Sequence, residues 1–439
     1  MSALNSVVRE INVGTNMGLL HVLWALVSGR LHPSRGALLP ALSDCGLSDQ
    51  EVRRAWRASC HGDWQISTLI DAHHLWVNTH TEWKRSAVHG YSISAMDMVG
   101  FFRPKLAGCK TKHYHSGSGQ ALPAVAFGML AEIGRIGAQR LPVLRRLVRT
   151  PDKHAKHSHT ELRKATIKAA REQQGAYEVI LADAEFGAGE VLLVGSGRFI
   201  LRADSNATYL RSGPKTYGGI GRKPTWGEVV RPLGRKYKGK LTPGSTPDAV
   251  ETWTLPDGRE VKAEIWNQVL LAKSIQKQLL REHPDQATPV CTTLLKVVAL
   301  HHPDYARPLL LQTNLLDASA RELADDGYLQ RWPIEELPLS AKHMVGAERQ
   351  FVSNPDHCQR LPEIQLLAGN ILSCVAAAIP PISTGFWDHD PKPTPGRLRK
   401  ALSKVAFPRN FPASALLRKK NSPGGYFPPQ LPRPTRILD

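Results

Sequence analysis

A twelve-residue stretch, Tyr91–Phe102 (YSISAMDMVGFF), alternates in the pattern of a β-strand. Positions 93, 95, 97, 99 and 101 share one face of such a strand, and all of them are apolar except Asp97. A charged side chain among apolar neighbours is costly unless it is paired, hydrogen-bonded or bound to a metal ion. The stretch therefore predicts a core strand that carries a candidate functional acid.

Other segments predict the rest of an α/β core. Ala121–Ile133 and Arg198–Arg202 (RFILR) have strand character, and the short apolar run Val179–Leu181 leads to Asp183. A capping box at 158–161 (S-x-x-E) predicts a helix between these strands. Acids at the ends of strands in an α/β sheet often lie at ligand sites, although a lone strand-end Asp is more often a turn former.

The first ninety residues are predicted to be helical. Met17–Val27 is apolar, a short helix is expected near 33–42, and Ser48 with Glu51 forms a capping box that opens a third helix. This outline is that of a helix-turn-helix, and an ordinary helical bundle is the alternative. In the DNA-binding interpretation, the last helix would present Arg53, Arg54 and Arg57.

The charge of the chain favours a polyanionic partner. Lys and Arg number 57 against 38 Asp and Glu, which gives a net charge of +19. Residues 211–240 hold nine of these cations and one acid, broken by Gly and Pro, so they predict a basic loop or hairpin that follows phosphates. A solvated basic loop is the alternative. The candidate contacts are Arg222, Lys223, Arg235, Lys236 and Lys238.

Composition also excludes several classes. Six cysteines without a C-x-x-C pair indicate a reducing, intracellular compartment and no zinc-cysteine site. No apolar stretch reaches the roughly 18–20 residues of a membrane span, and no signal peptide is recognised. The histidines between 113 and 159, including the cluster at 154–159, are interpreted as loop residues and not as a metal site.

A second motif lies near the C-terminal third, where Tyr328, Arg331, Glu335 and Lys342 follow the spacing Y-x2-R-x3-E-x6-K. On a regular α-helix these four side chains would fall within an arc of about 60°. A solvated helix face with an Arg–Glu pair is the alternative, and two prolines within the segment argue for a kink.

This spacing resembles the signature of a group of bacterial insertion-sequence transposases, which are DDE enzymes with an RNase H-like catalytic core. Asp97 resembles the first acid of that group and Asp183 the second. Glu335, and not Glu336, matches the third. The resemblance covers roughly residues 91–375.

The resemblance implies an α/β, RNase H-like (integrase-like) core interrupted by a β-rich insertion and preceded by a helical domain. The expected domains are a possible DNA-end-binding domain at 1–90, the first part of the core at 91–204, the basic insertion at 205–312, the second part of the core at 313–378, and a Pro-rich, basic, extended tail at 379–439.

It also implies a reaction. The three acids would hold Mg²⁺, or Mn²⁺ in its place, for cleavage of the terminal inverted repeats and joining of the 3′-OH to target DNA. Arg331, Lys342 and Tyr328 would grip DNA phosphates. Trp332 would either stack on a displaced base or be a buried core residue. A homodimer in the synaptic complex and a bacterial cytoplasmic, nucleoid-associated location follow from the family alone.

Two alternatives remain at this point. One is a metal-dependent nuclease that cuts DNA without joining it. The other is a catalytically inactive DNA-binding protein derived from a transposase, which the three intact acids argue against.

Overall fold

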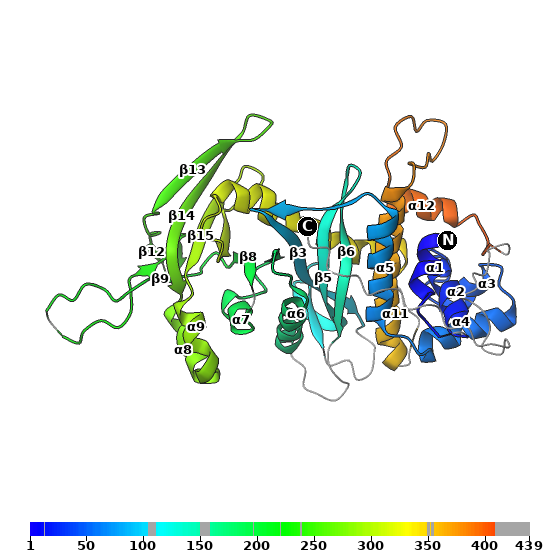
Figure 1. Ribbon diagram of the computed structural model, residues 1–439, viewed down its shortest axis with the longest axis horizontal. Helices are drawn as coiled ribbons and strands as arrows, with labels where there is room; N and C mark the ends of the chain where they lie inside the picture. The colour runs from blue at the N-terminus through cyan, green and yellow to red at the C-terminus, as the bar shows by residue number, and fades with distance from the viewer. Residues whose placement is uncertain are drawn as a thin grey trace. The chain divides into compact units, whose positions relative to one another are not determined.

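The computed structural model describes residues 1–12, 14–103, 111–149, 159–195, 197–219, 221–237, 239–348, 352 and 355–408 (Figure 1). The chain divides into two compact units. Strand β3 (Tyr91–Phe102) supplies its first half to unit 2 and its second half to unit 1. Unit 1 comprises Met1–Arg85, Met98–Leu162 and Pro333–Asp439, and unit 2 comprises Ser86–Asp97 and Arg163–Trp332.

Unit 1 begins with helices, as the sequence predicts. The predicted capping box opens α4, because the Ser48 N–H donates to Oε2 of Glu51 at 2.7 Å and the Glu51 N–H donates to Oγ of Ser48 at 3.5 Å. The helices are α1 (Ser2–Val8), α2 (Asn16–Val27), α3 (Leu38–Ser43), α4 (Asp49–His61) and α5 (Ile66–His80).

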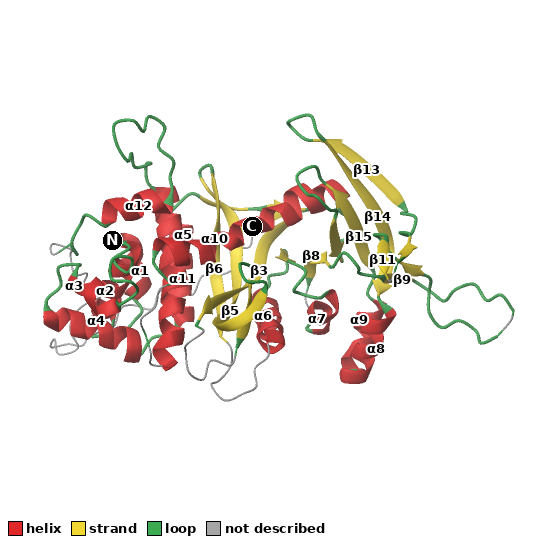
Figure 2. Ribbon diagram, turned by 180° about the vertical axis from the view of Figure 1, so that it is seen from behind, coloured by secondary structure: helices red, strands yellow, loops and turns green. Residues whose placement is uncertain are grey.

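The sheet of unit 1 is centred on β5 (Gln120–Ile136), the predicted second strand. It neighbours β3 and pairs with three further strands, β1 (Trp83–Arg85), β4 (Lys112–His115) and β6 (Gln139–Arg149). The long helix α11 (Pro355–Ala378) packs on β5 and β6, and it runs beside α5 in both ribbon views (Figures 1 and 2).

One helical segment of the described chain, His357–Ala378 in α11, is long and apolar enough to cross a membrane. Within its most apolar window, 78% of the segment is buried inside the protein, where α2, α4 and α5 cover it together with the sheet. A core helix passes the same test of length and composition, and its contacts identify α11 as the core helix of unit 1.

In unit 2 the sheet follows the order β3-β7-β8-β16-β15-β14-β9-β10. The predicted strands β7 and β8 are confirmed, and β3, β7 and β8 are parallel, whereas the other neighbouring pairs are antiparallel. The strands are β7 (Glu178–Ala182), β8 (Arg198–Ala203), β9 (Tyr209–Arg211), β10 (Val229–Val230), β14 (Glu260–Leu271), β15 (Leu295–His301) and β16 (Leu309–Thr313).

Shorter elements complete the two units. The predicted helix before β7 is α6 (His159–Gln173), although Ser158 of its predicted cap lies outside the described residues. Strand β2 (Ala87–Val88) precedes β3. Later in the chain come α7 (Ala188–Leu193), the hairpin of β11 (Arg235–Tyr237) and β12 (Lys240–Thr242), and β13 (Ala249–Thr254).

The segment 205–312 contains the expected strands, and it also contains two helices that were not predicted, α8 (Lys273–Glu282) and α9 (Pro284–Thr292). Helix α8 buries Gln276 and Leu279, which lie three residues apart on one side, and Pro284 begins α9 at a position where proline fits. The tail was expected to be extended, but α12 (Pro395–Leu402) begins at a proline in the same way and buries Leu398.

A close approach between α2 and α4 generates a stability prediction. A Cβ at Gly18 would lie 2.7 Å from the Cβ of Ala58 and 2.9 Å from the carbonyl oxygen of Arg54. We expect Gly18→Ala to destabilise the protein by about 1–3 kcal/mol, measured as a shift of the urea unfolding midpoint. Gly385→Ala is the control, because its Cβ would meet nothing within 4 Å. Equal midpoints for the two variants would contradict this account of the α2–α4 contact.

A buried histidine generates a pH prediction. His73 of α5 is fully buried, and burial lowers its pKa from 6.5 to about 3. The unfolded chain takes up a proton below its ordinary pKa while the folded protein does not, so stability present above pH 6.5 is lost as the pH falls. Between about pH 7.5 and about pH 5, wild type should lose about 2 kcal/mol more stability than His73→Phe in urea titrations.

The exposed His343 provides the control for this prediction. His343→Gln should keep the pH slope of the wild type. If His73→Phe also kept that slope, His73 would not be the residue responsible.

Candidate active site

The register of β3 and β7 relates the two predicted aspartates in unit 2. The printed pairing ends with Ala95 of β3 opposite Leu181 of β7, and Asp97 and Asp183 each lie two residues further along the chain. If the register continues, the two residues would lie at the same level and on the same face of the sheet.

A cation continues this row on the next strand. Leu181 pairs with Ile200 of β8 in the same parallel manner, and continuing the register places Arg202 opposite Asp183. Arg202 was not among the residues predicted from the sequence. The signal that could have found it is its place at the end of the predicted strand Arg198–Arg202.

The second cation comes from the signature motif. Nη1 of Arg331 donates to Oδ2 of Asp97 at 3.4 Å, and the two side chains are only 9% and 16% exposed. The guanidinium also lies 5.7 Å from the ring centroid of Tyr328, which is itself buried. The prediction that Arg331 and Tyr328 share a site is therefore consistent with their contact in unit 2.

The electrostatics of Asp183 follow from this arrangement. Burial raises the pKa of Asp183, and the nearby carboxylate of Glu185 adds to that rise. The backbone N–H of Glu185, which donates to Oδ1 of Asp183 at 3.0 Å, lowers the same pKa, as do the guanidinium groups of Arg331 and Arg202. The net effect is a carboxyl group that holds its proton more tightly than a solvated aspartate.

A buried hydrogen bond between Ser94 and Glu178 links the two strands that lead to Asp97 and Asp183. Glu178 at the start of β7 accepts a hydrogen bond from Oγ of Ser94 on β3, and it accepts another from the Gly175 N–H at 2.9 Å. Glu178 is 5% exposed. Glu178 thus links β3 to β7 and to the turn that precedes β7, and no motif in the sequence pointed to it.

The signature segment is not the regular α-helix that its spacing suggested. It consists of a 3₁₀ helix at Tyr328–Glu335, the short α10 (Glu336–Leu339) and a π-helical turn at Ser340–Met344. Pro333 lies in the first of these. Because the 3₁₀ and π turns change the angle per residue, the 60° arc expected for a uniform helix does not apply.

The third predicted acid belongs to the other unit. The segment passes from unit 2 to unit 1 between Trp332 and Pro333, so Glu335 and Lys342 are in unit 1. Glu335 is half-buried, whereas Glu336 is exposed. Two of the three predicted acids, Asp97 and Asp183, therefore belong to unit 2. Glu335 belongs to unit 1 but lies on the same 3₁₀ helix as Arg331.

Lys342 is held against two aromatic rings of unit 1. Its Nζ lies 5.9 Å from the ring centroid of Phe101 and 6.0 Å from that of Phe102, at the end of β3. Burial lowers the pKa of Lys342. Trp332 is 64% exposed, so the alternative that it is a core residue is wrong, and base stacking remains a prediction.

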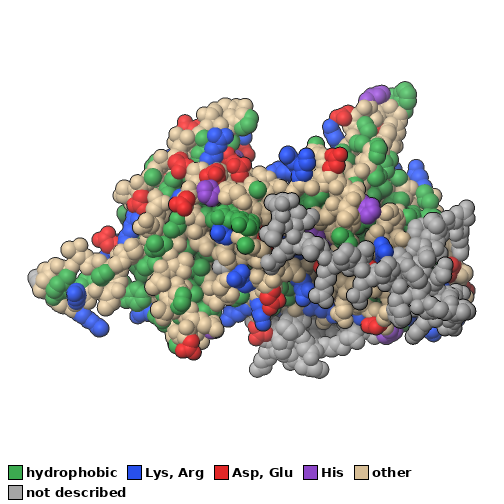
Figure 3. Space-filling model, viewed as in Figure 1, with side chains coloured by type: hydrophobic (Ala, Val, Ile, Leu, Met, Phe, Trp, Pro, Cys, Tyr) green, Lys and Arg blue, Asp and Glu red, His purple; other side chains and the backbone are tan. Residues whose placement is uncertain are grey.

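The predicted basic contacts of the insertion lie on its surface. Arg222 and Lys223 are exposed on the loop between β9 and β10, and Figure 3 shows Lys and Arg side chains (blue) on this loop. Arg235 and Lys236 are exposed on β11, and Lys238 lies outside the described residues.

The predicted DNA-contacting arginines of the N-terminal helices are partly exposed to solvent as well. Arg53 and Arg57 are exposed on α4, and Arg54 is half-buried. Their exposure leaves the DNA-binding interpretation and the helical-bundle alternative both open, because either would place cations on the surface.

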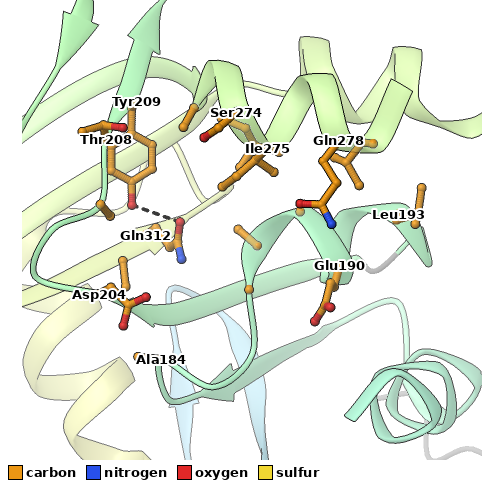
Figure 4. Close-up of a pocket in the computed structure, with 18 of the residues that line it drawn as sticks. Ala184, Glu190, Leu193, Asp204, Thr208, Tyr209, Ser274, Ile275, Gln278 and Gln312 are labelled. Carbon is orange, nitrogen blue, oxygen red and sulfur yellow. Dashed lines mark hydrogen bonds between the residues drawn. The ribbon is translucent and has the colours of Figure 1, made fainter. Parts of the chain in front are cut away.

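A pocket of about 450 Å³ opens in unit 2 next to the residues that follow Asp183 (Figure 4). Ala184 and Glu185, which follow Asp183, line it together with Arg202. On its far side the hydroxyl of Tyr209 donates to Oε1 of Gln312 at 3.0 Å. The two residues that follow Asp183 thus border this space.

Asp97 and Asp183 have the carboxylate oxygens that suit a divalent cation, but unit 2 does not contain a complete set of metal ligands among its described residues. Carboxylate oxygens are the ligands that Mg²⁺ prefers, and Asp97 and Asp183 offer them from adjacent strands. Among the described residues, no group of three or more His, Cys, Asp and Glu side chains is arranged to hold a metal ion. Nδ1 of His113 and Nε2 of His159 lie 3.1 Å apart. His154 and His157 of the predicted loop cluster lie outside the described residues.

The chain matches none of the known protein-family models, and no curated protein matches it.

The Asp97–Arg331 contact yields a prediction about coupling. In the presence of EDTA, Asp97→Asn and Arg331→Gln should show a coupling energy of about 1–3 kcal/mol in a double-mutant cycle, because each variant alone leaves a buried charge. Urea denaturation measures the four stabilities. Arg198→Gln is the control partner, since Arg198 contacts the Tyr91 ring at the opposite end of these strands. Additive effects of Asp97→Asn and Arg331→Gln would contradict the pairing.

Proposed function

We propose that this chain is a DNA transposase of the DDE type, which cleaves the ends of an insertion sequence and joins the 3′-OH to target DNA. The observation that carries the proposal is the contact in which Arg331 of the signature motif donates to Asp97, at the end of a strand whose parallel neighbour leads to Asp183. The sequence spacing alone did not require Arg331 and Asp97 to meet, so their contact in unit 2 supports the resemblance.

The strand order supports an RNase H-like core. In unit 1 the order is β6-β5-β3, and in unit 2 it continues from the same strand as β3-β7-β8, with these last three parallel. Helices α6 and α7 stand before and after β7, as parallel connections require. This is the arrangement that we propose for the catalytic core.

In the proposed reaction, Asp97 and Asp183 would hold Mg²⁺, and Glu335 is the proposed third ligand. Bound Mg²⁺ would neutralise charge on the phosphate oxygens and lower the pKa of a bound water. Arg331 presents a planar donor set that suits bidentate contact with a phosphate, whereas Lys342 is a point charge. The same site would serve cleavage and joining, because both are phosphoryl transfers.

The exposed basic groups fit a DNA partner. The loop and hairpin of the insertion place Arg222, Lys223 and Lys236 in solvent, where they would follow the phosphate backbone. The exposed Trp332 follows Arg331 directly and would stack on a displaced base. The homodimer in the synaptic complex and the nucleoid-associated location in the bacterial cytoplasm remain predictions from the resemblance.

The function is tested with labelled DNA from the flanks of the gene, in the presence of Mg²⁺. Wild type and Glu336→Gln should nick and join this DNA. Glu335→Gln should bind it but cleave about 10²–10³-fold more slowly, because a group that stabilises transition-state charge is lost.

Each other outcome identifies an alternative. Cleavage without a joined product would indicate a nuclease. Binding by all three proteins with no cleavage would indicate a catalytically inactive DNA-binding protein. Loss of activity in Glu336→Gln alone would show that the third acid had been assigned to the wrong residue.

A further inference from the structure

We propose that two side chains of the β-rich insertion, Glu251 and Lys296, position the signature segment. They hold the lead-in segment, residues 318–327, and thereby keep Arg331 at Asp97. This inference rests on the proposed function, because it takes Arg331 as a residue of the active site. Glu251 and Lys296 are positioning residues, since they act through Arg331 and not on the substrate.

The first observation is a buried lysine on the insertion strand β15. Nζ of Lys296 donates to the carbonyl oxygen of Ala318 at 2.6 Å, and the lysine side chain is buried. Burial lowers the pKa of Lys296, and three carboxylates, those of Glu251, Asp317 and Glu322, act in the opposite direction. A buried ammonium group that donates to a backbone carbonyl fixes the position of that carbonyl, because loss of the contact would leave a charge unsatisfied.

The second observation is an acid on the insertion strand β13. Oε2 of Glu251 accepts a hydrogen bond from the Ala320 N–H at 2.9 Å. Ala320 is the first residue of a helix, so its N–H has no acceptor within that helix. A carboxylate at this position satisfies the N–H and interacts favourably with the helix dipole. Glu251 and Lys296 thus hold two backbone groups of one helix start from two strands of the insertion.

The helix start has further contacts of its own. The Ser319 N–H donates to Oε2 of Glu322 at 2.8 Å, and the Glu322 N–H donates to Oγ of Ser319 at 3.2 Å, in the pattern of a capping box. Oε1 of Glu322 also lies 3.2 Å from Nδ1 of His89, in the turn between β2 and β3. The place where the lead-in segment begins is therefore well defined.

The winding of the segment explains why a fixed start matters. A π-helical turn at Glu322–Gly327 is followed directly by the 3₁₀ helix at Tyr328–Glu335. Hydrogen-bond geometry is poorer in a 3₁₀ helix than in an α-helix, and π turns are rare and often occur at functional sites. Further along, Nη1 of Arg331 donates to Oδ2 of Asp97 at 3.4 Å. A rotation or shift at the start would be carried along this irregular helix and would move Arg331.

The positioning role is tested with two substitutions at Glu251 in the full chain. Glu251→Ala removes the acceptor of the Ala320 N–H, whereas Glu251→Gln keeps an oxygen that can accept it. With labelled flanking DNA and Mg²⁺, we expect Glu251→Ala to cleave about 10–10²-fold more slowly than wild type, because Arg331 is misplaced. Its DNA affinity should stay within about threefold, since other cations still contact the phosphate backbone. Glu251→Gln should restore most of the cleavage rate.

The other positioning residue and a control are measured in the same assay. Lys296→Met removes the donor to the Ala318 carbonyl and should slow cleavage in the same way as Glu251→Ala. Thr252→Ala, at an exposed position of the same strand as Glu251, should cleave like wild type. Cleavage by Lys296→Met at the wild-type rate would remove Lys296 from the proposal.

A second measurement needs neither DNA nor a metal ion. Phenylglyoxal modifies accessible arginines, and mass spectrometry locates the adducts. Modification of Arg331 should be several-fold faster in Glu251→Ala than in wild type or Glu251→Gln, because a displaced segment exposes the guanidinium. Arg163, which pairs with Glu190 at 2.8 Å elsewhere in unit 2, should react at the same rate in all three proteins.

The outcomes separate the two proposals. Faster modification of Arg331 alone, in a protein whose wild type does not cleave DNA, would support the positioning of Arg331 and overturn the proposed function. Equal modification and equal cleavage by wild type and Glu251→Ala would overturn the positioning role and leave the proposed function intact. Faster modification of Arg331 and Arg163 alike would show a general loss of packing, and it would also overturn the positioning role.

Discussion

The parallel pairing of β3, β7 and β8 is the constraint on which the rest of unit 2 depends, because it aligns the strands that lead to Asp97, Asp183 and Arg202. Positive charge accompanies both acids, since Arg331 donates to Asp97 and the guanidinium groups of Arg331 and Arg202 lower the pKa of Asp183. The buried contact of Glu178 with Ser94 links the first two of these strands. Electrostatics and strand pairing are therefore two parts of one arrangement.

A comparison with a buried acid of unit 1 shows how the aspartates differ from a structural charge. Glu132 is 1% exposed, and burial alone would raise its pKa, but His74 at 3.1 Å, Arg85 at 2.8 Å and Arg145 at 3.6 Å lower it overall. Asp183, by contrast, has a raised pKa. The charges around Asp183 thus offset its burial less completely than those around Glu132 do.

Much of the local structure was predictable because it depends on short-range patterns. Period-two alternation located β3 to the residue, and the capping box located the start of α4. Composition was a poorer guide to single elements. The strand-rich segment 205–312 also contains the helix α8, and the helix α12 lies in a tail that was expected to be extended. A local capping or packing pattern overrides the average composition of a segment.

The sequence by itself determined the chemistry available: two aspartates in strand contexts, a four-residue signature, and an excess of cations over acids. The tertiary structure decided which of these groups meet. Parallel pairing of β3 with β7 aligns the strands that lead to Asp97 and Asp183, and the 3₁₀ helix that begins at Tyr328 carries Arg331, which donates to Asp97. These contacts join residues more than 80 positions apart, and no local periodicity encodes such a pairing, because it depends on how separate strands align.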